Sequence, residues 1–166
     1  MWRDYTIKEL YQKNLKKYMQ PHNARTGLAR RNPKMHKENH PMRMTVSMID
    51  NPTHIIADIA EKQLRSHVEK LPSYVKDTTP FFKRLESLKH NLPENTILFC
   101  MDVKSLYPSV PRKETLQACQ KALDNRLDKS IPSAEVLNMI SIVLENNYFT
   151  FVDKNYKQNN GTANRI

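Results

Sequence analysis

A run of five apolar residues ends directly in a carboxylate, and this junction constrains the fold more than any other part of the chain. The run is Ile97-Leu98-Phe99-Cys100-Met101, and Asp102 follows it. Such a run predicts a short strand that is buried on both faces. Removing an unpaired carboxylate from water is costly, so a charge at the tip of a buried strand indicates a cationic partner. Mg²⁺ is the typical partner because it takes oxygen ligands and leaves positions for substrate phosphates. Alternatively, Asp102 only caps a turn before Pro108.

Helical patterns account for most of the remaining chain. Apolar residues recur at spacings of three and four in five segments, which are residues 6–19, 52–71, 77–88, 112–127 and 133–146. The first of these begins with a capping box, in which Thr6 is the N-cap and Glu9 lies three residues later. In the segment 112–127, the residues expected to face inward are Leu116, Cys119, Leu123 and Leu127.

Strand patterns are fewer and shorter. Met42–Met48 is a candidate strand, and Tyr148–Val152 with Tyr156–Gln158 predicts a hairpin that turns at Asp153–Asn155. Residues 21–41 are polar, basic and interrupted by prolines, which predicts a loop or an irregular extended segment. Several helices with isolated strands and one hairpin predict the α+β class.

The charge of the chain favours a polyanionic partner. Lysine and arginine outnumber aspartate and glutamate by 27 to 17, which gives a formal charge of +10. Eight of these cations lie within residues 13–37. Lysine and arginine displace condensed counterions from phosphates, so nucleic acid is the expected partner. The alternative is a generally basic soluble protein.

Several other classes of protein are disfavoured. Two cysteines, Cys100 and Cys119, do not make a disulfide framework and indicate a reducing compartment. The N-terminus begins no apolar stretch typical of a signal peptide, and no run approaches the length that spans a bilayer, so no membrane partner is expected. Only two glycines are present, which excludes a glycine-rich phosphate loop. His36 and His40 lack a nearby cysteine pair that would complete a zinc set.

Four sequence blocks occur in an order that is typical of one family. They are Pro33-Lys34-Met35-His36-Lys37, then Pro41–Ser47 with Arg43 at its third position, then Asp102–Pro111, and finally Tyr148–Phe151 followed by Gln158–Ala163. In this order they resemble the reverse transcriptases of Penelope-like retroelements, which are relatives of telomerase. The resemblance implies a partial right-hand polymerase. Residues 1–32 would form an N-terminal helix and basic loop, residues 33–94 a fingers-like region, and residues 95–166 an incomplete palm.

The resemblance also implies a site for nucleotide addition by two-metal phosphoryl transfer. Asp102 would ligate both Mg²⁺ ions beside the backbone carbonyl of Val103. Tyr107 would lie under the incoming sugar as a steric gate, or would pack in the core. The remaining implied contacts are Arg43 and Gln158 with the deoxynucleotide triphosphate, and Lys34, His36, Lys37 and Gly161 with the RNA template and DNA primer. The alternative for the basic residues is a solvated loop.

The chain departs from the family pattern near its end. The family continues with Met-Gly after the position of Ala163, whereas this sequence has Asn164-Arg165-Ile166. The later hairpin with paired aspartates and the thumb are absent from the sequence. The expectation is therefore an intracellular, nuclear fragment of an RNA-directed DNA polymerase that is inactive as it stands. The alternative is a non-catalytic, basic nucleic-acid-binding protein derived from a retroelement.

Overall fold

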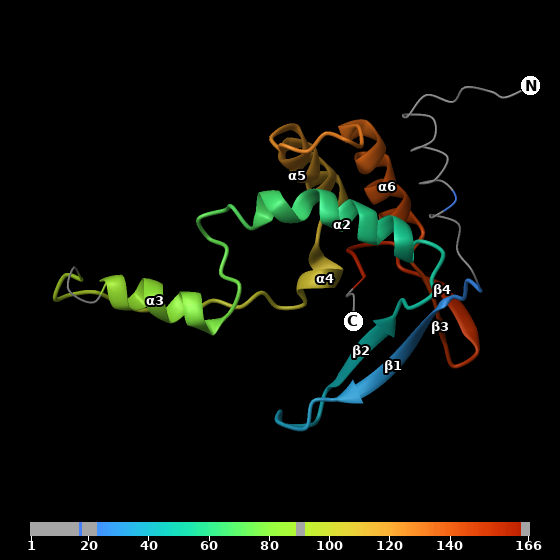
Figure 1. Ribbon diagram of the computed structural model, residues 1–166. Coiled ribbons are helices and arrows are strands. Elements are labelled where there is room, and N and C mark those ends of the chain that lie inside the picture. Colours follow the sequence, from blue (N-terminus) through green and yellow to red (C-terminus); the bar gives the residue numbers. More distant parts are fainter. Residues whose placement is uncertain (1–16, 18–22, 89–91, 164–166) are drawn as a thin grey trace, which may run out of the picture.

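A computed structural model describes residue 17 and residues 23–88 and 92–163, and in these residues the chain is α+β (Figure 1). The helix predicted over residues 6–19 lies outside the described residues except for Lys17. No helix of the described part is long and apolar enough to cross a membrane. The elements, in chain order, are β1 (Gly27–Pro33), β2 (Met42–Ser47), α2 (His54–Val68), α3 (Thr78–Leu88), α4 (Leu106–Ser109), α5 (Arg112–Asp124), α6 (Ser133–Glu145), β3 (Tyr148–Phe151) and β4 (Lys154–Lys157).

The strands form one mixed sheet in the order β2-β1-β3-β4. β1 pairs antiparallel with β2, where Arg30 lies opposite Thr45, and it pairs parallel with β3, where Leu28 lies opposite Thr150. The strand predicted over 42–48 is confirmed, but the prediction of an irregular segment over 21–41 is wrong for residues 27–33. Polar residues are compatible with this strand because β2 pairs along residues 28–33, β3 pairs with Gly27 and Leu28, and one face of the strand meets solvent.

The hairpin predicted near the end of the chain is confirmed, although its turn is displaced. β3 and β4 pair from Tyr148–Lys157 to Phe151–Lys154, so the turn consists of Val152 and Asp153. Both turn residues have positive φ angles, 47° and 59°. A two-residue turn of this kind matches the twist of the strands, but it places the β-branched Val152 in an unfavourable region.

The hydrophobic core lies among three helices that are distant in sequence. α2 packs on α6 and α5, and Leu123 and Val136 are fully buried between them. The rest of the buried cluster comprises Ile59, Ala60, Ile131 and Met139. The prediction that Leu127 faces inward is wrong, because α5 ends at Asp124 and the Leu127 side chain is 85% exposed.

A long arm containing α3 extends away from this core (Figure 1). The Asp77 carboxylate accepts a hydrogen bond from the backbone N–H of Thr79, as expected at a helix start, but no residue of α3 is buried. The apolar stripe of α3 is exposed at Phe81, Phe82, Leu85 and Leu88.

The buried strand predicted over Ile97–Met101 is a wrong prediction for the described structure. These residues form no strand, and the Ile97 and Met101 side chains are each 83% exposed. An apolar run becomes a buried strand only if neighbouring strands take up its backbone hydrogen bonds and other elements cover its faces. No described strand pairs with this segment.

Candidate functional site

Two of the sequence blocks meet where the segment after β4 lies against α4. The N–H of Thr162 donates a hydrogen bond of 2.9 Å to the carbonyl oxygen of Tyr107. Gly161, which directly precedes Thr162, is buried and has a φ angle of +71°. A Cβ atom at Gly161 would lie 2.2 Å from the Tyr107 carbonyl oxygen and 2.7 Å from the Pro108 backbone. Glycine is therefore required here both by the conformation and by the close approach of the two backbones.

Gln158 organises the segment that approaches α4. Its side-chain amide donates to the carbonyl oxygens of Asn160, at 2.8 Å, and Thr162, at 3.1 Å. Its Oε1 accepts a 2.8 Å hydrogen bond from the buried Asn147 side chain, and its N–H donates to the Asn147 carbonyl. In this structure the Gln158 side chain is thus occupied in holding the loop, and a contact with nucleotide stays a prediction.

Arg112 joins the same two segments, and sequence reasoning did not identify it. Its guanidinium donates to the carbonyl oxygens of Gln158, at 2.7 Å, and Gly161, at 3.2 Å. A cation in the first turn of a helix is opposed by the helix dipole, so its position at the start of α5 was a signal of a specific partner. We call the group formed by Tyr107, Arg112 and residues 158–162 the α4 junction.

Asp102 and Val103 take no part in the α4 junction. Both are exposed on the irregular segment that leads to α4, which the chain enters through Ser105 in the left-handed conformation, with φ 55°. Within the described part of the chain, no three His, Cys, Asp or Glu side chains are grouped so that they could hold a metal ion. A pair of Mg²⁺ ions needs more than one carboxylate. Among the described residues Asp102 is a single carboxylate, so the metal pair stays a prediction that needs further donors.

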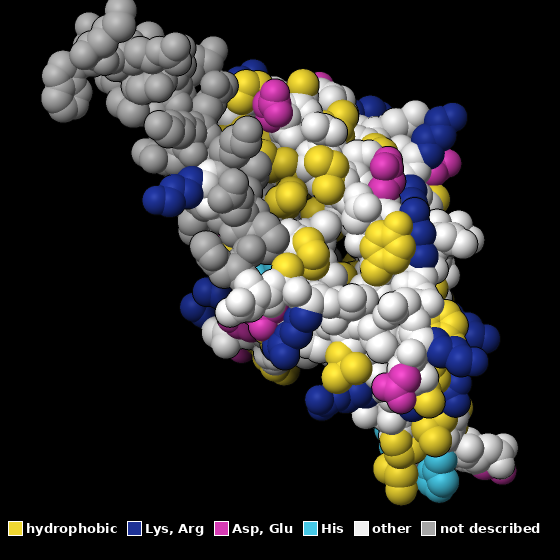
Figure 2. Space-filling view, turned by 90° about the vertical axis from the view of Figure 1, so that its right-hand side faces the viewer, with side chains coloured by type: hydrophobic (Ala, Val, Ile, Leu, Met, Phe, Trp, Pro, Cys, Tyr) yellow, Lys and Arg dark blue, Asp and Glu magenta, His cyan; other side chains and the backbone are white. Residues whose placement is uncertain are grey.

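The β1–β2 hairpin carries the predicted basic residues. Lys34, His36 and Lys37 lie in its turn, which is closed by hydrogen bonds from Lys34 N to Pro41 O and from Lys37 N to Lys34 O. Arg43 is exposed on β2 opposite Asn32. Lys and Arg side chains spread over the lower part of Figure 2, and hydrophobic and histidine side chains meet solvent at its lowest point. The structure thus brings these four predicted residues together on one projecting hairpin.

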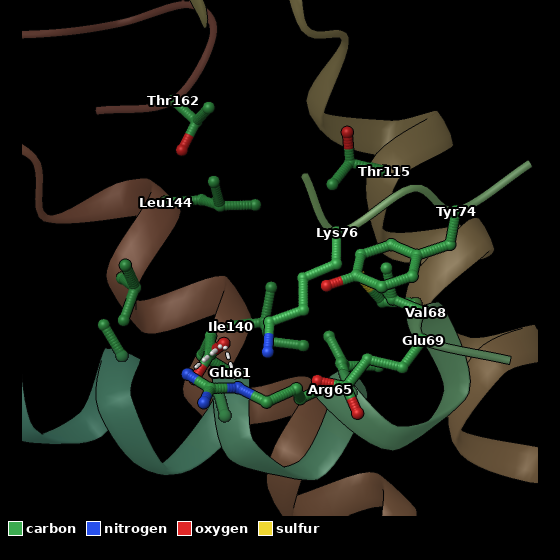
Figure 3. Close-up of a pocket in the computed structure, with 15 residues that line it drawn as sticks. Glu61, Arg65, Val68, Glu69, Tyr74, Lys76, Thr115, Ile140, Leu144 and Thr162 are labelled. Atoms are coloured by element: carbon green, nitrogen blue, oxygen red, sulfur yellow. Dashed lines mark hydrogen bonds and ion pairs between the residues drawn. The ribbon is translucent and has the colours of Figure 1, made fainter. Parts of the chain in front are cut away.

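A mainly apolar pocket of about 650 Å³ lies among α2, α5, α6 and the segment after α2 (Figure 3). Glu61 and Arg65 form a bidentate ion pair beside it, with both contacts at 2.9 Å. The hydrogen bond to Glu61 raises the pKa of Arg65 further above its ordinary value, so this residue stays a cation. Burial raises the pKa of the Cys119 thiol, which also lines the pocket. A neutral thiol is a poor nucleophile, so the pocket does not indicate cysteine chemistry.

No protein-family model, curated protein or solved structure matches this chain. The functional interpretation therefore depends on the sequence blocks and on the geometry described above.

Replacing Gly161 by alanine should weaken the α4 junction and the fold. We expect Gly161→Ala to lower the free energy of unfolding by at least about 1–2 kcal/mol, the usual cost of a left-handed L-residue, because the added Cβ also clashes with backbone atoms that cannot rotate away. Urea unfolding measures the change. Asn159→Ala is the control, since Asn159 is exposed and its effect should stay within about 0.5 kcal/mol. Equal stabilities of the two variants would contradict the assigned role of Gly161.

Proposed function

We propose that the chain is the fingers and first palm portion of a retroelement reverse transcriptase, and that as given it binds nucleic acid without extending a primer. Nucleotide addition by two-metal phosphoryl transfer would belong to a parent polymerase that supplies further carboxylates. Its substrates would be an RNA template, a DNA primer and deoxynucleotide triphosphates, with Mg²⁺ bound at Asp102. The basic hairpin would contact the phosphates of the template or of the nucleotide.

The α4 junction is the observation that supports this proposal most directly. Tyr107 and Gly161 belong to separate sequence blocks, and nothing local in the sequence requires them to meet. In the structure their backbones are in contact, and the close approach requires the glycine that the fourth block contains. Under the proposal the two blocks meet because Tyr107 would lie beside the incoming nucleotide and Gly161 beside the template and primer.

A second candidate function is a basic nucleic-acid-binding protein that does no metal chemistry. It is favoured by the exposed position of Asp102 and by the absence of a three-residue donor group from the described residues. Both candidates bind polynucleotide, but they differ in their response to metal. Under the first candidate, Mg²⁺ should strengthen the binding of a deoxynucleotide to the chain when a template–primer duplex is present, and this effect should require Asp102. Under the second candidate, Mg²⁺ should have no such effect.

Binding to nucleic acid should depend steeply on salt. We expect the full chain to bind RNA and RNA–DNA hybrid with an affinity that falls with a log–log slope of about −0.7 to −0.9 per phosphate contacted. Fluorescence anisotropy between about 50 and 300 mM salt, roughly a sixfold range of ionic strength, measures the slope. Lys34→Ala/Lys37→Ala should reduce its magnitude by about 1.4 to 1.8. The control, Lys121→Ala/Lys129→Ala, removes two exposed lysines of the helical region and should leave the slope unchanged.

Primer extension separates the fragment from an active enzyme. We expect no template-dependent incorporation with Mg²⁺ or Mn²⁺, because one exposed carboxylate does not hold two ions. Incorporation that disappears in Asp102→Ala would overturn the predicted inactivity. Deoxynucleotide binding that is changed neither by Mg²⁺ nor by Asp102→Asn would favour the second candidate function over the first.

A further inference from the structure

The four-stranded sheet has one face on which no described side chain is buried. Side chains alternate between the two faces of a strand, so the pairing register assigns each residue to a face. Members of the open face alternate with residues such as the buried Ala29, which lies on the opposite face. By this register the open face comprises Leu28, Arg30, Asn32, Arg43, Thr45, Ser47, Tyr148, Thr150, Asn155 and Lys157.

The contacts among these residues agree with the assignment. Asn32 donates to the Thr45 hydroxyl at 3.3 Å, and Thr150 Oγ1 bonds Asn155 Oδ1 at 2.8 Å. The Lys157 ammonium lies 5.3 Å from the centroid of the Tyr148 ring. No described element with strong contacts to the sheet lies across this face, because the recorded contacts of each strand are with other strands.

The charges on the open face lie in two groups, one on β1 and β2 and one on β3 and β4. Arg43 on β2 and Arg30 on β1 are diagonal neighbours, which places them about 7–8 Å apart. Lys157 on β4 lies opposite Tyr148 on β3, but the register places this pair four residues along the strands from Arg30, roughly 13 Å away, on a sheet about 14 Å wide. The face contains no aspartate or glutamate. A single strand of nucleic acid can reach both groups, with its phosphates at the cations and a base against the exposed aromatic ring.

The opposite face is less suited to this role. The Phe149 and Tyr156 rings stack on each other with centroids 5.6 Å apart, and Arg31 lies 4.8 Å from the centroid of the Phe151 ring. Its aromatic faces are thus already partly occupied. Tyr148 on the open face is 42% exposed, much like Tyr156 at 43%, but its ring is met by a lysine that a base could displace toward a phosphate, and not by another ring.

We propose that the open sheet face binds single-stranded nucleic acid, with Arg43, Arg30 and Lys157 contacting successive parts of the phosphate backbone and Tyr148 stacking on a base. This inference rests on the proposed function, because it names the surface through which the chain would hold its template. It goes further by assigning Arg30, Tyr148 and Lys157, which lie outside the block positions that carry the family's implied contacts.

The sheet offers matched controls for Arg30, Lys157 and Tyr148. Residues of the same types, which are Arg31, Lys154 and Tyr156, lie on the opposite face. Arg30→Ala/Lys157→Ala should weaken binding of a fluorescent 12-nucleotide single-stranded RNA at least tenfold and reduce the salt slope by about 1.4. Arg31→Ala/Lys154→Ala removes the same net charge from the same strands. It should change the affinity less than threefold and leave the slope unchanged. Circular dichroism of every variant confirms that the fold is retained.

The aromatic contact has its own pair of variants. Tyr148→Ala should lower the affinity about 5- to 100-fold without changing the salt slope, which is the behaviour of a stacked base. Tyr156→Ala, on the opposite face, should have little effect. Both tyrosine variants should bind a blunt RNA duplex as the unmodified chain does, because paired bases are not available to stack.

The results separate the two proposals. Equal losses from the Arg30/Lys157 and Arg31/Lys154 pairs would overturn the assignment of the face, since net charge alone would then explain binding. If only Lys34→Ala/Lys37→Ala weakens RNA binding, the assignment of the open face is also overturned, while the proposed function stays intact. A chain that binds no RNA at low salt would overturn both.

Discussion

Leu123→Ala is expected to lower the free energy of unfolding by about 2–5 kcal/mol. Leu123 is fully buried where α2, α5 and α6 meet, in one cluster with Ile59 and Val136. Truncation removes its apolar contacts and leaves a cavity that the rigid helices fill only in part. The total stability of a domain is about 5–15 kcal/mol, so this single change would remove a large part of it.

The control for this prediction is the same substitution four residues later. The sequence pattern predicted that Leu123 and Leu127 both face inward, whereas the structure leaves Leu127 85% exposed. Leu127→Ala should therefore change the stability by no more than about 0.5 kcal/mol. Urea unfolding of both variants gives the two values. Similar losses would mean that α5 continues further than the structure shows and that the core is larger.

Hydrogen exchange should differ by about a thousandfold or more between the arm and the helical core. The backbone N–H groups of Ile97–Met101 donate none of the hydrogen bonds recorded among the described residues, so they should exchange almost as fast as in an unfolded chain. The central amides of α2 and α6 lie in the packed core and should open only with unfolding of the domain. α3 has helical hydrogen bonds but no buried residue, so its protection should be intermediate.

This pattern of protection differs from the one that the sequence resemblance implies. The incomplete palm that the resemblance implies would leave residues 96–160 less protected than residues 52–90. The structure instead places α5 and α6 with α2 in the core and leaves α3 outside it. Mass spectrometry of the exchanged chain tests this at several concentrations. Strong protection of Ile97–Met101 in a monomer would contradict the exposed arm, whereas protection that appears only at high concentration would indicate pairing of this segment between copies.

Patterns within single elements were sufficient to predict most helices and the terminal hairpin. α2 follows from apolar residues at helical spacing after Pro52, and α3 follows from the cap at Asp77. In β3 and β4, aromatic residues flank a short turn. These signals are local, because capping, helical periodicity and turn formation depend on residues close together in the chain. The α+β class followed from them.

The candidate site could be predicted only in part. Sequence blocks indicated Lys34, Arg43 and Tyr107, but not that the first two share a hairpin distant from the third. Gly161 was identified by its block, whereas the reason for it, the contact with the Tyr107 carbonyl, required the structure. Arg112 was missed because its partners are backbone carbonyls 46 and 49 residues away, and its position at the start of a helix signals a partner without identifying it.

The sequence by itself determined where helices and turns form, the excess of positive charge and the order of the blocks. The tertiary structure alone decided which apolar segments are buried and which residues share a face of the sheet. Ile97–Met101 is as apolar as any core strand, yet it is exposed because no described strand supplies its hydrogen bonds. Residues 27–33 have the composition of a loop, yet they form a strand because β2 pairs along residues 28–33 and β3 pairs with Gly27 and Leu28. Burial and strand pairing are properties of two or more segments together, so one segment's composition does not fix them.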